Sequence, residues 1–158
     1  MPACVFFGNV KNDYESIDII DLSDIYENIC DFFEFLIAKK GVKLFYTVAN
    51  SDFDYLCGMA IESLKEKYAD IVLIKFAAKN DRAFANDIAF DRIINSSRAG
   101  YIKRCECAAF CSDYILIDNG MLKGLRGDIF NYFVLGKCFR EKNVHIFCLG
   151  QHGIRAII

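Results

Sequence analysis

Short apolar runs alternate with helix-length segments along the chain, and this alternation predicts the fold. Each run is almost wholly apolar and ends in small or polar residues. A strand that is apolar at every position is buried on both faces, and strands separated by helix-length segments need crossover connections. The pattern therefore predicts an α/β protein, a three-layer sandwich with a central, mainly parallel five-stranded sheet. The five predicted strands are Ala3 to Phe7, Val42 to Thr47, Ile71 to Phe76, Tyr114 to Ile117 and Val144 to Leu149.

The segments between these strands carry helix signals of different strength. A helix is predicted to begin at Leu22-Ser23-Asp24 and to end at Lys39-Lys40-Gly41, because basic residues followed by glycine are typical of a helix C-terminus. Ser51 can cap the next helix, and Asp54 three residues later completes a capping box. The remaining predictions are helices at Arg82 to Ile94, Ala99 to Phe110 and Asp128 to Lys142, and a loop over the carboxyl edge of the sheet at residues 9–22.

Composition fits one domain over residues 1–158. The chain has 54% hydrophobic residues, a single proline, Pro2, and no linker-like or low-complexity stretch. Its apolar stretches have strand length and are interrupted by charges, so neither a membrane span nor a signal peptide is predicted, and we expect a cytoplasmic protein.

Charge and aromatic content bear on the partners. With 19 basic and 21 acidic residues and no basic block, the chain lacks the phosphate-neutralising surface that long nucleic acids require. A local anion site remains compatible with this balance. Fifteen Phe and eight Tyr are many for a monomer of this size, which favours a homo-oligomer that covers part of one helical face.

The eight cysteines lie inside apolar runs, as reduced core thiols do. The cluster Cys105-x-Cys107-x-x-x-Cys111 is the one candidate metal site, but on a helix Cys105 points away from the other two and no neighbouring His completes a tetrahedral set. We therefore predict no metal and no other cofactor. A redox role for Cys105 stays open.

Several stretches, in order, resemble a known family. They are Cys4-Val5-Phe6-Phe7-Gly8, Gly41-Val42-x-x-Phe45 leading to Ser51-Asp52-Phe53-Asp54, Glu62 to Tyr68, Arg98 to Arg104, and Ser112-Asp113-Tyr114. In order and spacing they resemble small bacterial members of the SLOG superfamily, Rossmann-like proteins related to the DNA-processing protein DprA and to the Lonely Guy phosphoribohydrolases. The resemblance covers residues 3–148 and implies a Rossmann-like domain with a pocket for a nucleotide or nucleotide-derived ligand at the carboxyl edge of the sheet.

The chain departs from the family pattern at several motif positions. Gly8-Asn9-Val10 stands where related sequences have Gly-His-Arg, and Arg104-Cys105 stands where they have Arg-Asn. The Gly-Gly-Thr element has its nearest counterpart in Gly120 to Asp128, which puts Asn131 at the position of the catalytic Glu. Hydrolysis of an N-glycosidic bond needs a carboxylate near the cationic transition state, and an Asn side chain cannot supply one. Asp128 could substitute for it, and Asp52 or Asp54 could reach the site from the end of the second strand.

We therefore predict ligand binding, for sensing rather than catalysis. Glycine backbones and helix N-termini can hold a phosphate, an arginine can add a charge-assisted contact, and Asp54 or Asn119 can accept ribose hydroxyls. The predicted ligand-binding residues are Gly8, Asn9, Ser51, Asp54, Arg104, Asn119, Gly124, Gly127 and Asp128.

Other interpretations remain for these residues and for the function. A role as helix cap accounts for Ser51 and Asp54 equally well. Asp118-Asn119-Gly120 is also a turn signal, and Arg104 could instead form an internal ion pair with an aspartate. Two other functions stay open: an N-glycosidase that acts on nucleoside monophosphates, and an oligomeric scaffold that has kept the fold and lost the site.

Overall fold

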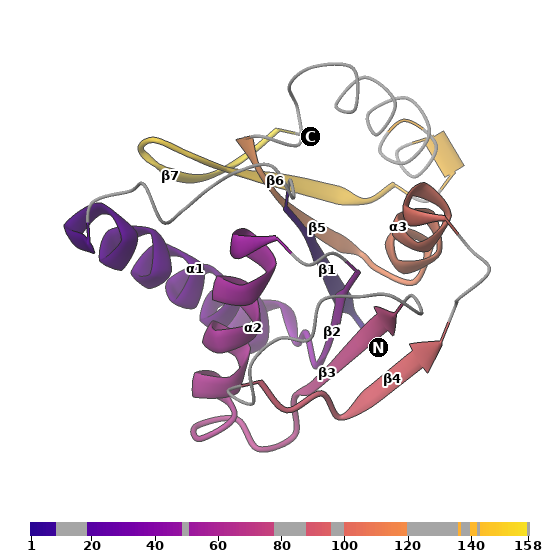
Figure 1. The fold of residues 1–158 in the computed structure, drawn as a ribbon, viewed down its shortest axis with the longest axis horizontal. Helices are drawn as coiled ribbons and strands as arrows, with labels where there is room; N and C mark the ends of the chain where they lie inside the picture. Colours follow the sequence, from indigo (N-terminus) through magenta and orange to yellow (C-terminus); the bar gives the residue numbers. More distant parts are fainter. Residues whose placement is uncertain are drawn as a thin grey trace.

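A computed structural model describes residues 1–8, 19–48, 51–77, 88–95, 100–119, 136, 140–141 and 143–157. In this part of the chain, helices cover a seven-stranded sheet (Figure 1). The elements are β1 (Ala3–Phe7), α1 (Ile19–Lys40), β2 (Leu44–Thr47), α2 (Asp52–Leu64), β3 (Val72–Ala77), β4 (Arg92–Asn95), α3 (Tyr101–Phe110), β5 (Tyr114–Asp118), β6 (His145–Gly150) and β7 (Gly153–Ala156).

The strands lie in the order β4-β3-β2-β1-β5-β6-β7. Every neighbouring pair is parallel except β6 and β7, which are antiparallel. From β1 the chain adds strands outward on one side as far as β4, and then returns to place β5 on the other side of β1. The predicted mixed α/β architecture with a mainly parallel sheet is confirmed, and the strand order is compatible with a Rossmann-like fold.

The predicted number of strands is wrong, because the sheet has seven strands and not five. The missed strands are its two edges. Residues Arg92–Asn95 fall at the end of the helix predicted around Arg82 to Ile94, but they form β4, whose side chains are mostly exposed and give no continuous apolar run. The strand β7 follows the two-residue turn Gln151-His152, and its first residue, Gly153, pairs with Gly150 at a positive φ of 104°.

Both faces of the sheet are covered, which explains why the central strands are apolar at every position. On one face, Phe6 and Phe45 contact Phe33 of α1, with ring centroids 5.7 and 5.3 Å apart, in a cluster that also contains α2 residues. On the other face, Phe7 packs with Cys105 and its neighbours on α3. Figure 1 shows α1 and α2 together on one side of the sheet and α3 on the other, which gives three layers.

The helix ends agree with their sequence signals in most places. The capping box of Ser51 and Asp54 is present at the start of α2, as predicted, and α1 ends at Lys40 before Gly41, which has φ 69°. The start of α1 was predicted too late: residues 19–22, assigned to the loop over residues 9–22, are already helical. Most of the helix predicted from Asp128 to Lys142 lies outside the described residues.

Two further observations concern the surface of the described part. No helix there combines the length and the apolar character that crossing a membrane requires. Large exposed apolar side chains include Phe35 on α1, Ile93 on β4 and Ile157 after β7. These lie on different elements, and the homo-oligomer stays a prediction.

Candidate functional site

The small and polar residues at the carboxyl ends of the parallel strands lie along one edge of the sheet. Gly8 follows β1, Asn119 follows β5, and Gly150 ends β6. The helices that follow β2 and β4 run back across the sheet, so the N-termini of α2 and α3 lie at the same carboxyl edge. The crossover from one half of the sheet to the other falls between β1 and β5, where ligands bind in many doubly wound sheets.

On the β1 and β2 side of this crossover, hydrogen bonds within the protein engage the carboxyl group of Asp54. Its Oδ2 accepts from the backbone N–H of Gly8 at 3.2 Å and from that of Ser51 at 3.3 Å, and its Oδ1 accepts from the Thr47 hydroxyl at 3.3 Å. The Ser51 hydroxyl also donates to Oδ2 and accepts from the Asp54 backbone N–H at 3.1 Å. Both side chains are buried. The Asp54 carboxyl therefore ties β1, β2 and α2 together.

The fit of Gly8 into this corner explains why a glycine stands there. A Cβ at this position would come within 2.1 Å of Ser51 Oγ and 2.6 Å of Phe53 Cβ. The end of β1 and the first turn of α2 are thus in direct contact, with no space for a ligand between them. The described contacts give Gly8, Ser51 and Asp54 a structural role, which agrees with the helix-cap alternative, and their predicted role in ligand binding stays a prediction.

The pKa of Asp54 also depends on Asp118, for which the sequence indicated only a place in a turn. Burial raises the pKa of Asp54 to about 7, hydrogen bonds from Ser51 oppose the rise, and the negative charge of Asp118 adds to it. Asp118 is the last residue of β5 and is itself buried. The sequence signal for it was a carboxylate directly after four apolar residues, at the end of a strand buried on both faces.

The first turn of α3 brings Arg104 and Tyr101 to the same edge. Arg104 is only 8% exposed, and its backbone N–H donates to the carbonyl of Gly100 at 3.1 Å. Burial raises the pKa of Tyr101, and its interactions with Cys105, Asp54 and Asp118 act in the same direction. For Arg104, both a ligand role and an internal ion pair with an aspartate stay predictions.

The thiols of α3 separate as helical geometry requires. Cys105 is buried while Cys107 and Cys111 are exposed. Burial raises the pKa of the Cys105 thiol, which keeps it protonated and unreactive and argues against a redox role. Within the described residues, no group of three or more His, Cys, Asp or Glu side chains is arranged to hold a metal ion.

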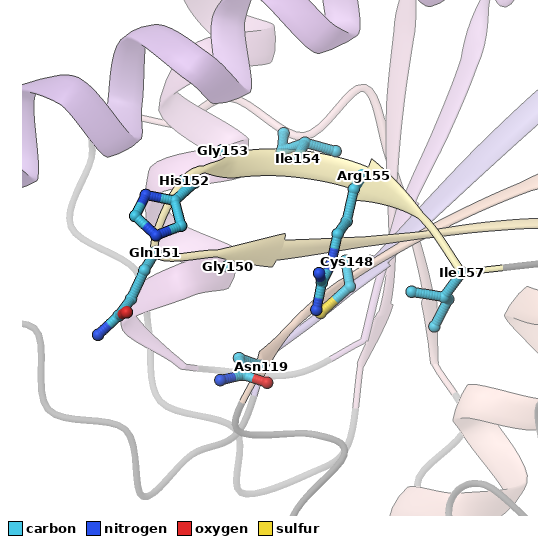
Figure 2. Close-up of a pocket in the computed structure, with 9 residues that line it drawn as sticks. All are labelled: Asn119, Cys148, Gly150, Gln151, His152, Gly153, Ile154, Arg155 and Ile157. Carbon is cyan, nitrogen blue, oxygen red and sulfur yellow. The ribbon is translucent and has the colours of Figure 1, made fainter.

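On the β5 and β6 side of the crossover, the carboxyl edge is hollow. A pocket of about 430 Å³ lies between Asn119 and the β6–β7 hairpin (Figure 2). Among the described lining residues, Asn119 is the one that was predicted to bind a ligand. The described lining residues are Asn119, Cys148, Gly150, Gln151, His152, Gly153, Ile154, Arg155 and Ile157.

Arg155 is the functional candidate that the sequence analysis missed. It lies opposite Cys148 in the β6–β7 pair, and Figure 2 shows its guanidinium group beside the Cys148 sulfur, on the side of the strands that faces Asn119. Burial raises the pKa of Cys148, the charge of Asp118 adds to this, and the charge of Arg155 opposes it. Arg155 itself gave no sequence signal, and only the glycines on either side of Gln151-His152 favoured a turn before it.

The other predicted site residues, Asn9, Gly124, Gly127 and Asp128, lie outside the described part of the chain. Of the predicted set, the structure thus brings Gly8, Ser51 and Asp54 together in a closed corner, and places Asn119 in a pocket across the crossover. Comparisons with known proteins add no family: the chain matches no family model, and no curated protein matches it significantly.

Proposed function

We propose that this protein is a Rossmann-like domain, related to the SLOG superfamily, that binds a small nucleotide-type ligand for sensing rather than catalysis. The observation that carries the proposal is the pocket between Asn119 and the β6–β7 hairpin, at the carboxyl end of β5 and β6. Parallel α/β sheets bind ligands beyond the carboxyl ends of their strands, next to the point where the strand order reverses. Asn119 directly follows β5, which is one of the two strands at that point.

The size and lining of the pocket support a small polar ligand. Its volume of about 430 Å³ lies in the range that small-molecule sites usually have. The amide groups of Asn119 and Gln151 can both donate and accept hydrogen bonds, as ribose hydroxyls and base edges require. Arg155 supplies a positive charge for an anionic group, and Ile154 and Ile157 supply apolar surface.

The lining favours binding over hydrolysis. Cleavage of an N-glycosidic bond needs a carboxylate at the reacting carbon, and the described lining residues include none. The carboxyl group of Asp54, one of the earlier candidates for this role, is buried and accepts hydrogen bonds from Gly8, Ser51 and Thr47. A pocket lined by amides, an imidazole and a guanidinium group is suited to binding a ligand and releasing it chemically unchanged.

Thermal unfolding in the presence of nucleosides, nucleoside monophosphates and ribose 5-phosphate tests the proposal. A ligand at 100 times its Kd stabilises the native state by about 2.7 kcal/mol. For a chain of this size, that raises Tm by roughly 5–10 °C. We expect such a shift with at least one compound.

Two arginine variants assign the shift to the pocket. Arg155→Ala removes a lining residue on the edge strand β7, and Arg92→Ala removes an exposed arginine from the opposite edge strand β4. We expect the shift to fall sharply in Arg155→Ala and to persist in Arg92→Ala. If no compound raises Tm in the unmodified protein, the proposed function is wrong and the scaffold hypothesis takes its place.

A further inference from the structure

The β6–β7 hairpin holds the side chain of Arg155 at the pocket. Successive residues of a strand point to opposite faces, and Figure 2 shows Ile154 and Arg155 on opposite sides of β7. Ile154 packs against the apolar cluster beneath α1, and α1 lies against β7. This packing fixes the face of β7 that Arg155 occupies, so the guanidinium group is directed to the side of Asn119 by the fold and not by a flexible loop.

The charges around the pocket leave Arg155 available to an anion. Within the described part of the chain, Arg155 forms no ion pair, and the lining has no carboxylate among the described residues. Asp118 raises the pKa of Cys148, but it is 1% exposed and is not among the described lining residues of the pocket. His152 also lines the pocket, at the hairpin turn, but Figure 2 shows its ring apart from the guanidinium group of Arg155.

We infer that the β6–β7 hairpin is a phosphate clamp, in which Arg155 binds the phosphate monoester of the ligand while Asn119 contacts its organic part. This inference rests on the proposed function and narrows it to phosphorylated ligands. A guanidinium group can donate two parallel hydrogen bonds to phosphate oxygens, which a lysine cannot reproduce. The site differs from the predicted contacts at Gly8 and Arg104, because it lies on an edge hairpin.

Calorimetric titration of matched pairs tests the clamp. The probes are the four common nucleoside 5′-monophosphates, the four nucleosides, ribose 5-phosphate and inorganic phosphate. The proteins are the unmodified chain, Arg155→Ala, Arg155→Lys, His152→Gln and the control Arg92→Ala. We expect one monophosphate to bind at least tenfold more tightly than its nucleoside. Arg155→Ala should abolish this preference, Arg155→Lys should retain only part of it, and His152→Gln, at the turn away from the guanidinium group, should leave it largely unchanged.

The possible failures are distinguishable. If a nucleoside and its monophosphate bind equally, or if Arg155→Ala weakens both equally, the clamp is wrong while the proposed nucleotide-type pocket stands. If inorganic phosphate binds and Arg155→Ala abolishes this binding, but no nucleoside part adds affinity, the clamp stands and the proposed function is wrong. If nothing binds to the unmodified protein, both are wrong. Circular dichroism of each variant confirms that the fold is intact.

Discussion

Two corners of the same sheet edge use similar residue types in opposite ways. At the Asp54 corner, formed by Gly8, Thr47, Ser51 and Asp54, the carboxyl oxygens accept hydrogen bonds from the strand ends and the helix start. At the hairpin pocket, on the other side of the β1–β5 crossover, Asn119 and Arg155 line a hollow of about 430 Å³. Polar residues that follow a buried strand are therefore ambiguous by themselves.

The chain that follows each strand explains the difference. The helix α2 begins at Asp52, five residues after β2 ends at Thr47, and its first turn packs directly on the end of β1. In its capping box the backbone N–H of Asp54 donates to the Ser51 hydroxyl and that of Ser51 donates to the Asp54 carboxyl group, so the two side chains bond to each other's backbone. At β6 the chain instead turns into an antiparallel edge strand, which leaves the space beside Asn119 uncovered by the described residues.

The largest expected effect in this comparison is the pH dependence that Asp54 confers on stability. Its pKa of about 7 in the native protein compares with an ordinary value of 3.8, so between these values the native state binds a proton that the unfolded state has released. Stability therefore falls as the pH rises from 4 to 7, by up to about 4 kcal/mol from this group. Asp54→Asn has no such proton, and its urea unfolding free energy should lose this part of the slope.

The matched control for Asp54 is Asp24→Asn, because Asp24 is exposed on α1. The measurement is the difference in unfolding free energy between each variant and the unmodified protein at pH 4.5, 6 and 8. We expect the difference for Asp54→Asn to move in favour of the variant as the pH rises. A difference independent of pH would mean that Asp54 is ionised throughout this range and that the corner tolerates a buried charge.

The second effect comes from the close approach at Gly8. In Gly8→Ala the added methyl group would lie 2.6 Å from Phe53 Cβ, which cannot move without shifting α2. Overpacking of this kind typically costs about 1–3 kcal/mol, and we expect the upper end because Ser51 Oγ is also in the way. Gly100→Ala is the control, since nothing lies within 4 Å of a Cβ there. Equal unfolding midpoints for the two variants would show that the corner can open.

The helix cap gives the third effect. Ser51→Ala removes the acceptor for the Asp54 backbone N–H and one donor to the Asp54 carboxyl group, and loss of such a cap costs about 1 kcal/mol. Ser23→Ala, at an exposed position within α1, is the control and should not destabilise the protein. Chemical unfolding measures both. A cost for Ser51→Ala no greater than that for Ser23→Ala would remove the capping explanation for Ser51 and leave its predicted ligand role.

The sequence could predict features that depend on neighbouring residues in the chain, but not features that depend on which segments pack together. The central strands and the Ser51 capping box depend on neighbours in the chain, and both signals were sufficient. The edge strand β4 is mostly exposed, so its four residues lack the apolar run that marks a buried strand. Arg155 gave no signal because its role depends on which strand pairs with β6. Residue type predicted that polar groups gather at the edge, and only the tertiary arrangement separates folding contacts from a pocket.

The smallest effect on stability, and the sharpest contrast with Asp54, is expected at Asn119. Its side chain is exposed at the pocket, so Asn119→Ala should change the unfolding free energy by no more than about 0.5 kcal/mol. If Asn119 contacts the organic part of the ligand, the same variant should weaken nucleoside and monophosphate binding equally, by several-fold, because one neutral hydrogen bond contributes about 1 kcal/mol. Arg155→Ala should weaken the monophosphate alone. Titrations of both variants separate these patterns, and a loss of stability in Asn119→Ala comparable to that in Ser51→Ala would make the pocket wall a folding element like the Asp54 corner.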